Sequence, residues 1–323
     1  MTLRAAGETT ILGAGPAGSL MTILLARRGI PVKLIERRAD PRISSLTGGR
    51  SINLALADRG LHALKVAGLY DAVQPLLIPM SGRMLHDVNG STQFVPYGQR
   101  EHEVIYSVSR NGLTQLLLEH AQHFPHVQML FESECTHVDL EHRDLKLAHY
   151  TSTTAFNQLI AADGYHSVAR KNLLSAMHAS ASDEILPHGY KELTLPADRN
   201  RQHQMHRNAL HIWPRGGFML IALPNIDGSF TVTLFLPFES NASPDFAGLR
   251  DKPGINAFFA EYFPDALKLM PGLSEEFLIH PTGKMHTIRT PHWTDGNNVV
   301  LIGDAAHAIV PFHGQGMNCA FED

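Results

Sequence analysis

Three glycines near the N-terminus have the spacing that binds a dinucleotide. Gly13, Gly15 and Gly18 form a GxGxxG motif between a short apolar segment, Thr9–Leu12, and an apolar helix that should end near Gly29. The first glycine permits a tight turn, the second lets a pyrophosphate approach the backbone, and the third allows the helix to pack closely on the strand. The free N–H groups at the start of the helix also attract phosphate. The motif therefore predicts a dinucleotide site, and a chance glycine turn is the alternative.

Acidic residues at the ends of predicted strands are candidates to complete this site. Glu36 follows the apolar segment Val32–Ile35, where an acid can accept hydrogen bonds from a ribose diol. Asp304 follows a second apolar run in a Gly-Asp pair, and its carboxylate is suited to a polyol such as the ribityl chain of a flavin. GxGxxG together with a distant Gly-Asp pair favours FAD, although Asp304 could instead only cap the next segment. Asp163, in an Asp-Gly pair, is equally well explained as a helix cap.

The composition is that of an ordinary globular protein of about two domains. The chain has 323 residues, of which 44% are hydrophobic and 18% charged, and its net charge of -4 gives no electrostatic case for nucleic acid. No apolar run approaches the roughly 18 residues that a membrane span needs, and the N-terminus lacks the layout of a signal peptide. Cys135 and Cys319 are the only cysteines, which favours a reducing cytoplasm over a disulfide-bonded protein.

The elements that must position the glycines and acids follow an α/β pattern. Strand, helix and strand alternate in the first 36 residues, and Ser109 is placed to cap a helix over LTQLLLEHAQ. Asn89 and Gly90 predict a tight hairpin turn. Three segments between residues 208 and 237, NALHIWP, FMLIALP and SFTVTLFLP, are separated by turn sequences. The alternation in the third segment predicts an antiparallel sheet with one face in a core and the other over a different partner.

Other polar residues have simpler interpretations. Lys191 and Glu192 are neighbours in HGYKEL and are interpreted as an exposed surface pair. His120, His123 and His126 recur every three residues, but Pro125 interrupts the helix that would align them. No metal site is therefore predicted.

The order of GxGxxG, Asp-Gly and Gly-Asp resembles the aromatic hydroxylase class of FAD-dependent monooxygenases. Within that class the chain resembles the kynurenine 3-monooxygenase family in long stretches, at residues 49–69, 82–86, 188–193, 208–225, 229–237 and 303–323. The resemblance implies an α/β fold in which a Rossmann-like FAD-binding domain carries an inserted antiparallel-sheet substrate domain. The first domain would comprise residues 1–80, 100–180 and 285–323, and the second residues 81–99 and 181–284.

The resemblance also implies roles for residues that pattern alone would not select. Beside the glycines, Glu36 and Asp304, the residues expected to contact FAD are Arg38, Ala55, Arg110, Met317 and Asn318. Arg83 and Tyr97 would bind the carboxylate of an amino-acid substrate; without the family they would be interpreted as a surface arginine and a turn tyrosine. The residues expected to form an apolar floor under the substrate ring are Leu210, Ile212, Ile221, Leu223, Thr233 and Phe235.

The implied activity is hydroxylation of L-kynurenine to 3-hydroxy-L-kynurenine with NADPH and O2, in tryptophan degradation towards NAD synthesis. The flavin would carry the chemistry, so no side chain is named as a catalytic acid or base. NADPH would bind transiently at a site that the sequence does not place. Alternatives are a related hydroxylase of another aromatic substrate, or a flavin disulfide reductase, which the wide separation of Cys135 and Cys319 disfavours.

The last ten residues, GQGMNCAFED, suggest a further alternative, an FAD-binding remnant with little or no turnover. They are typical of the first turns of a helix, and Glu322 and Asp323 place negative charge at its C-terminal end. Each such charge is unfavourable by roughly 0.3–1 kcal/mol, and no basic cap is evident. The family continues into a helical region that closes the substrate pocket. We therefore expect a truncated chain that still binds FAD but hydroxylates poorly.

Overall fold

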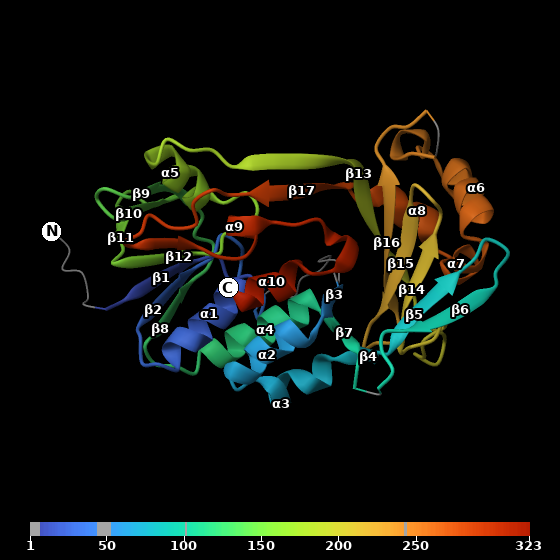
Figure 1. Ribbon diagram of the computed structural model, residues 1–323, viewed down its shortest axis with the longest axis horizontal. Helices are drawn as coiled ribbons and strands as arrows, with labels where there is room; N and C mark the ends of the chain where they lie inside the picture. Colours follow the sequence, from blue (N-terminus) through green and yellow to red (C-terminus); the bar gives the residue numbers. More distant parts are fainter. Residues whose placement is uncertain (1–6, 44–52, 101, 242–243) are drawn as a thin grey trace.

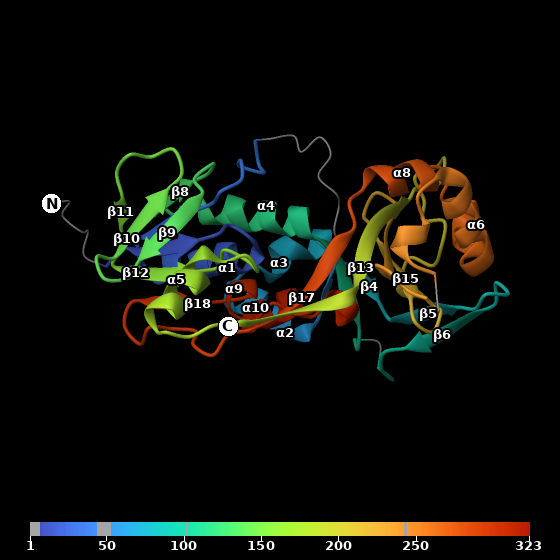
Figure 2. The ribbon, with the colours of Figure 1, turned by 90° about the horizontal axis from the view of Figure 1, so that it is seen from above.

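The computed structural model describes residues 7–43, 53–100, 102–241 and 244–323 of the chain. Figure 1 shows two layered parts lying side by side along the longest axis. Two long strands, β13 (Ser182–Leu195) and β17 (Gly283–Arg289), run from one part to the other, as Figure 2 shows from above. Residues 49–52, which belong to one of the family-like stretches, lie outside the described residues.

A parallel sheet organises the first part, and its strand order is β18-β12-β1-β2-β8. The strands are β1 (Thr9–Leu12), β2 (Val32–Ile35), β8 (Val127–Leu130), β12 (Gln158–Ala161) and β18 (Val299–Leu301). All four residues of β1 are buried, because this strand is central and both faces of the sheet are covered. The carboxyl ends of parallel strands meet at one edge of a sheet, and ligands bind there. This edge therefore brings together Gly13, Glu36, Asp163 and Asp304.

Helices cover one face of the parallel sheet, and a small sheet covers the other (Figure 1). On the first face lie α1 (Pro16–Ala26) and α4 (Arg110–Ala121), with α2 (Asp58–Val66), α3 (Tyr70–Val73), η1 (Gln74–Leu76) and α10 (Gly316–Glu322) packed beside them. On the second face lie β9 (Cys135–Asp139), β10 (Asp144–Leu147), β11 (Thr154–Ala155) and α5 (Val168–Ala176). This layered arrangement confirms the predicted α/β class.

A seven-stranded sheet organises the second part, in the order β17-β13-β16-β15-β14-β5-β6. Its other strands are β5 (Gly82–His86), β6 (Thr92–Pro96), β14 (Ala209–Pro214), β15 (Met219–Pro224) and β16 (Phe230–Pro237). One face packs against η2 (Phe246–Gly248), α6 (Lys252–Tyr262), α7 (Pro264–Leu269) and α8 (Leu273–Ile279). The three predicted strands between residues 208 and 237 are confirmed, and in the third of them Val232 and Leu234 face the helix-side core as the alternation predicted.

The prediction that this sheet is antiparallel holds for every neighbouring pair except one. β5 and β14 run parallel, with Leu210 beside Arg83 and Ile212 beside Leu85. The exception arises because β5 and β6 come from an earlier segment of the chain and join the sheet at its edge. The proposed domain limits place this hairpin with the sheet, and those limits remain a prediction.

A third sheet, β3-β7-β4, lies between the two parts (Figure 1). Its strands are β3 (Asn53–Leu56), β4 (Ile78–Met80) and β7 (Ile105–Ser109), and the short helices α9 (Asp304–His307) and η3 (Pro311–His313) follow β18. Ser109 caps α4 as predicted, since its Oγ accepts a hydrogen bond of 3.2 Å from Gly112 N. Gly29 and Gly90 have the expected positive φ angles of 74° and 84°. Within the described ranges, none of the helices combines the length and the apolar character that crossing a membrane would require.

Candidate cofactor and substrate site

The three glycines of the loop after β1 occupy three different environments. Gly13 has a φ of 94°, and a Cβ there would collide with the carbonyl oxygen of Ala162. A Cβ on Gly18 would collide with Gly13 O, so this glycine allows α1 to pack tightly on the strand end. A Cβ on Gly15 would meet no protein atom within 4 Å. Gly13 and Gly18 are thus required by the protein itself, whereas the space beside Gly15 is free for a ligand.

Glu36 lies at the end of β2 and is only 5% exposed. Its carboxylate accepts hydrogen bonds from Ala14 N at 2.8 Å and from Arg38 N at 2.9 Å, and it pairs with Arg38 Nε at 2.8 Å. Burial raises the pKa of this carboxyl, but the hydrogen bonds and charge of Arg38 outweigh burial and lower the pKa overall. A carboxylate has about four acceptor positions, and Arg38 Nη2 at 3.3 Å occupies the fourth. A ribose hydroxyl would therefore bind Glu36 by replacing a contact of the Arg38 side chain, which is 61% exposed. Arg38 was predicted to contact FAD directly, and here it also orients Glu36.

Asp304 begins α9 directly after Gly303, whose φ is 58°. Its side chain is open to solvent on one side. Burial against the surrounding protein nevertheless raises the pKa of its carboxyl, and the charges of Arg110 and His307 partly oppose this. Among the described residues, none donates a hydrogen bond to this carboxylate. Asp304 is thus an acceptor held ready for a ligand, and the fold brings the predicted Arg110 close to it.

Asn318 joins α10 to β3, across more than 260 residues of chain. Its Oδ1 accepts a hydrogen bond of 2.8 Å from Ala57 N, which is 261 residues away in sequence. Its Nδ2 donates to Ala55 O at 2.8 Å. Asn318 is fully buried, and Met317 beside it packs into the core formed by α1, α2 and α4. The structure therefore brings Ala55, Met317 and Asn318 together, as the family resemblance implied.

The acids at the end of α10 have basic partners, contrary to the sequence-based expectation. Glu322 pairs with Arg59 at 2.7 Å. Asp323 accepts a hydrogen bond of 2.6 Å from Gly303 N and contacts His307 Nε2 at 2.8 Å. No basic residue lies in the last turn of α10, as the sequence indicated, but partners that lie far away in the sequence pair with both carboxylates. The contacts hold α10 against the turn that carries the Gly-Asp pair.

Arg83 and Tyr97 lie together at the edge of the seven-stranded sheet. The guanidinium carbon of Arg83 is 5.1 Å from the centre of the Tyr97 ring. Burial raises the pKa of the Tyr97 hydroxyl, while hydrogen bonding to Arg83 opposes that rise. The hydroxyl is therefore a neutral donor beside a permanent cation. This combination suits a carboxylate.

The six residues predicted to form an apolar floor share one face of this sheet. Their positions follow from the register, which pairs Ile212 with Ile221 and Ile221 with Thr233. Arg83 lies on the same face, because it pairs with Leu210. The opposite face, with Trp213, Leu220 and Leu234, packs on the helices. The ring of Phe312, from η3, lies 5.3 Å from that of Phe235 and covers part of the floor. Phe312 was not selected from the sequence.

Comparison with known proteins decides the family. The family model described as "FAD binding domain" matches residues 7–323. Kynurenine 3-monooxygenase of Dictyostelium discoideum is 43% identical over 314 residues, which cover 97% of this chain and 67% of that protein. The enzyme of the same name from Myxococcus xanthus is 46% identical over 319 residues, covering 97% of this chain and 68% of that protein. The chain belongs to the kynurenine 3-monooxygenase family. It spans about two thirds of the length of these relatives.

Solved structures of an oxygenase and of PqsL, titled a probable FAD-dependent monooxygenase, share the fold with this family member. The tetrameric form of 2-methyl-3-hydroxypyridine-5-carboxylic acid oxygenase is 21% identical, with a TM-score of 0.76 over 97% of this chain and 79% of that chain. PqsL of P. aeruginosa, in complex with 2-aminobenzoylacetate, is 18% identical, with a TM-score of 0.76 over 98% of this chain and 83% of that chain. At these identities the likeness establishes the fold alone.

The residues of this kynurenine 3-monooxygenase family member fit FAD. The open space beside Gly15 suits a pyrophosphate at the start of α1, the buried carboxylate of Glu36 suits a ribose, and the available carboxylate of Asp304 suits a polyol. All three lie at the carboxyl edge of the parallel sheet. FAD is therefore the cofactor, and the contacts of individual residues with it remain predictions.

Asp163 and Arg170 lie near this edge, and the structure shows what each of them contacts. Asp163 caps α5, because its Oδ2 accepts hydrogen bonds from Val168 N at 2.8 Å and Ala169 N at 3.3 Å. This supports the capping interpretation. Arg170, only 7% exposed, donates to Ala305 O at 2.9 Å and to Tyr165 O at 2.5 Å. It ties the Asp-Gly turn to the Gly-Asp turn.

Lys191 and Glu192 are not a surface pair. They are 6% and 7% exposed, and as neighbours in β13 they point to opposite faces of the sheet. Lys191 Nζ donates to the carbonyl oxygens of Phe277 and His280 at 2.9 Å and 2.6 Å, at the end of α8. Lys191 thus caps a helix on one side of the sheet, and Glu192 lies on the side of the floor.

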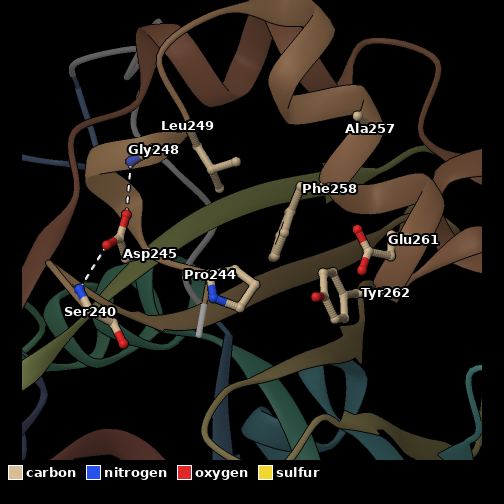
Figure 3. Close-up of a pocket in the computed structure, with 9 residues that line it drawn as sticks. All are labelled: Ser240, Pro244, Asp245, Gly248, Leu249, Ala257, Phe258, Glu261 and Tyr262. Atoms are coloured by element: carbon tan, nitrogen blue, oxygen red, sulfur yellow. Dashed lines mark hydrogen bonds between the residues drawn. The ribbon is translucent and has the colours of Figure 1, made fainter. Parts of the chain in front are cut away.

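Two hollows lie outside the predicted contacts. One, of about 210 Å³, lies between the third sheet and the β15–β16 turn, where Asn53 Nδ2 and Ser107 Oγ both donate to Pro224 O at 2.9 Å. The other, of about 440 Å³, lies under α6 (Figure 3). There the carboxylate of Asp245 already accepts hydrogen bonds from Ser240 N at 2.7 Å and Gly248 N at 2.8 Å. This second hollow is on the helix side of the sheet, away from Arg83.

Proposed function

We propose that this chain binds FAD and hydroxylates L-kynurenine to 3-hydroxy-L-kynurenine with NADPH and O2. The observation that carries the proposal is the pair of Arg83 and Tyr97 at the border of an apolar floor. L-Kynurenine combines an anionic carboxylate with an aromatic ring, and this face offers a partner for each. The names of the 43–46% identical relatives support the same substrate.

The chain's own residues position the substrate and exclude water. The guanidinium of Arg83 attracts the carboxylate, and the Tyr97 hydroxyl donates a hydrogen bond to it. The carboxylate end is thereby fixed, and the ring lies on Ile212, Ile221 and Thr233. When bound, FAD supplies the redox chemistry that activates O2. Fixing the ring beside the cofactor lowers the entropic part of the barrier, and apolar walls keep water from the reacting centre.

Compartment and co-substrate complete the proposal. Cys135 and Cys319 are free thiols, which favours the reducing cytoplasm. Burial raises the pKa of the Cys135 thiol to about 12, so it is unreactive and has no place in the redox chemistry. NADPH acts as the transient reductant, and no residue is assigned to its binding.

The test is a flavin spectrum of the purified chain, followed by NADPH oxidation and product formation with and without L-kynurenine. We expect bound FAD, and 3-hydroxy-L-kynurenine only when substrate is present. Arg83→Ala should keep FAD but bind L-kynurenine about 10- to 150-fold more weakly, since a charge-assisted hydrogen bond contributes about 1.5–3 kcal/mol. Arg199→Ala, at an exposed loop position, is the matched control. FAD-loaded protein that forms no product, or prefers another aromatic acid from a panel, would refute the assignment.

A further inference from the structure

A chain of hydrogen-bonded side chains lies on the face of the seven-stranded sheet opposite the floor. Asp265 Oδ2 contacts His86 Nδ1 at 2.7 Å, and His86 Nε2 contacts His211 Nδ1 at 2.8 Å. His211 Nε2 then contacts the backbone carbonyl of His206 at 2.9 Å. His86 and His211 are 6% and 1% exposed. This series of hydrogen bonds links α7, β5 and β14 through buried polar groups.

The partners at the two ends determine where the protons are. A carbonyl oxygen only accepts, so His211 Nε2 carries hydrogen and, in a neutral ring, His211 Nδ1 is the acceptor. Burial lowers the pKa of His211 to about 4, which keeps this ring neutral. His86 Nε2 must therefore donate to His211. At the other end, burial raises the pKa of Asp265, but hydrogen bonds from His86 and Trp213 outweigh this, so the carboxyl is ionised.

An ionised Asp265 accepts on both oxygens. Trp213 Nε1 donates to them at 2.9 Å and 3.0 Å, so the contact with His86 Nδ1 must also be a donation by the histidine. Both nitrogens of His86 then act as donors, Nδ1 to Asp265 and Nε2 to His211. Trp213 stacks on this ring with a centroid distance of 4.0 Å. The geometry thus gives every ring nitrogen of His86 and His211 a hydrogen-bond partner.

His86 lies on β5, the strand that carries Arg83. Arg83 and Tyr97 together are called the substrate clamp. β5 joins the sheet only through its pairing with β14, since β6 on its other side is the edge. The carbonyl of His86 is also held, by Arg215 Nη1 at 2.9 Å. Tyr97 follows β6, and its backbone N donates to Ser81 O at 3.0 Å, just before β5. The position of β5 therefore sets the position of both clamp residues.

The apolar pattern of β5 does not define its register. Met84 and Leu85 are neighbours and point to opposite faces, so each face receives an apolar residue in either register. A slip of one residue would move Arg83 from the floor face to the helix face. It would also move His86 onto the floor and separate it from Asp265 and His211. Buried polar groups are well suited to prevent such a slip, because leaving them unpaired is costly.

We propose that Asp265, His86 and His211 act as positioning residues that fix β5 in register and so hold Arg83 and Tyr97 at the substrate carboxylate. The inference rests on the proposed function, because it assumes that the clamp binds a carboxylate. It gives the helix face of the sheet a role in substrate recognition.

The test compares binding of L-kynurenine with binding of kynuramine, which lacks the carboxylate, to FAD-loaded protein by calorimetry. The ratio of the two affinities reports on the clamp alone. We expect the double variant Arg83→Ala with Tyr97→Phe, which removes both clamp contacts, to reduce this ratio to near one. His86→Phe keeps an aromatic ring against Trp213 and should lower the ratio by at least about 10-fold, the effect of one charge-assisted hydrogen bond. Adding His86→Phe to the double variant Arg83→Ala with Tyr97→Phe should change it no further.

Phe259→Leu is the control for general destabilisation, because Phe259 is fully buried in the same helix-side core but outside the hydrogen-bonded chain. It should leave the ratio unchanged. An unchanged ratio in His86→Phe overturns the inference while the proposed function stands. Equal affinities of the unmodified protein for the two ligands overturn the carboxylate clamp itself, and the inference with it.

A second measurement does not depend on whether His86→Phe folds. In protein with ¹⁵N-labelled histidine, both ring nitrogens of His86 should have shifts of the protonated type. Asp265→Asn removes the counter-charge while keeping the side-chain shape, and should convert His86 to a singly protonated ring together with a lower affinity ratio. A singly protonated His86 in the unmodified protein overturns the proton assignment. Asp265→Asn with an unchanged ratio overturns the positioning role.

Discussion

A side chain at Gly15 should block FAD without disturbing the protein, and the structure gives the reason. Gly15 precedes α1 with φ of -71° and ψ of 178°, a backbone conformation that any residue adopts. A Cβ there would meet no protein atom within 4 Å. Gly15→Ala should therefore change the free energy of unfolding of the apoprotein by less than about 1 kcal/mol, since small losses at the N-cap and small gains in chain entropy nearly cancel.

The effect on FAD binding should be much larger. The pyrophosphate approaches the backbone at this glycine and accepts hydrogen bonds from the start of α1. A methyl group in that space would push the phosphate away and cost at least one charge-assisted hydrogen bond, about 1.5–3 kcal/mol. This corresponds to a Kd for FAD about 10- to 150-fold higher. Gly15→Val fills more of the space and should leave the protein colourless.

Gly13→Ala is the contrasting variant. Its φ of 94° is strained for any side chain, and a Cβ would collide with Ala162 O. Such strain costs about 1–3 kcal/mol, so the apoprotein itself should be less stable. Fluorescence titration with FAD gives Kd, and urea unfolding of the apoproteins gives stability. Gly15→Val that binds FAD as tightly as the unmodified protein would refute the assignment of the pyrophosphate, and Gly15→Ala as unstable as Gly13→Ala would refute the packing argument.

Three further substitutions test the electrostatics of the fold. Asp304→Asn should weaken FAD binding but stabilise the apoprotein at neutral pH. Burial raises the pKa of this carboxyl, so its ionisation opposes folding. The difference in urea midpoint between variant and unmodified protein should vanish as pH falls below the ordinary pKa of aspartate. Asp323→Asn should destabilise the protein more at pH 6 than at pH 9. Hydrogen bonding and charge from Asp323 raise the pKa of His307, so the stabilisation is present below the ordinary pKa of histidine and is lost as pH rises through the raised value; equal losses at both pH values would contradict this. Lys191→Met should lower the free energy of unfolding, measured in urea, by about 1–3 kcal/mol, because two buried carbonyls lose their donor. An unchanged urea midpoint would show that the ammonium is replaceable.

Local signals in the sequence were sufficient for much of the fold. The GxGxxG loop lies between β1 and α1, Ser109 caps α4, and the Asn89-Gly90 turn joins β5 to β6, as predicted. These features depend on residues within a few positions of one another. Each residue type there has a backbone or capping preference strong enough to act without tertiary contacts.

The sheet face that a residue occupies and the side chains that it contacts were predicted less well, because both depend on segments that are distant in the sequence. Lys191 and Glu192 look like a surface pair in isolation. In the structure α8 covers Lys191, and Glu192 lies on the floor face of the sheet. The acids at the end of α10 appeared unpaired, although Arg59 and His307 meet them. In each case the deciding neighbour is brought in by packing, and sequence spacing carries no information about it.

The sequence by itself determined the cofactor chemistry and the strands that carry it. The glycines, Glu36 and Asp304 each follow a strand, and parallel strands bring such positions to one edge of a sheet whatever the details of packing. Only the tertiary structure decided what the polar residues on the second sheet do. His86 and Asp265 are 179 residues apart, and their side chains meet because β5 runs parallel to β14 under α7. Hydrogen bonds act over a few ångströms, so the protonation of His86 is a property of the folded arrangement and of no segment within it.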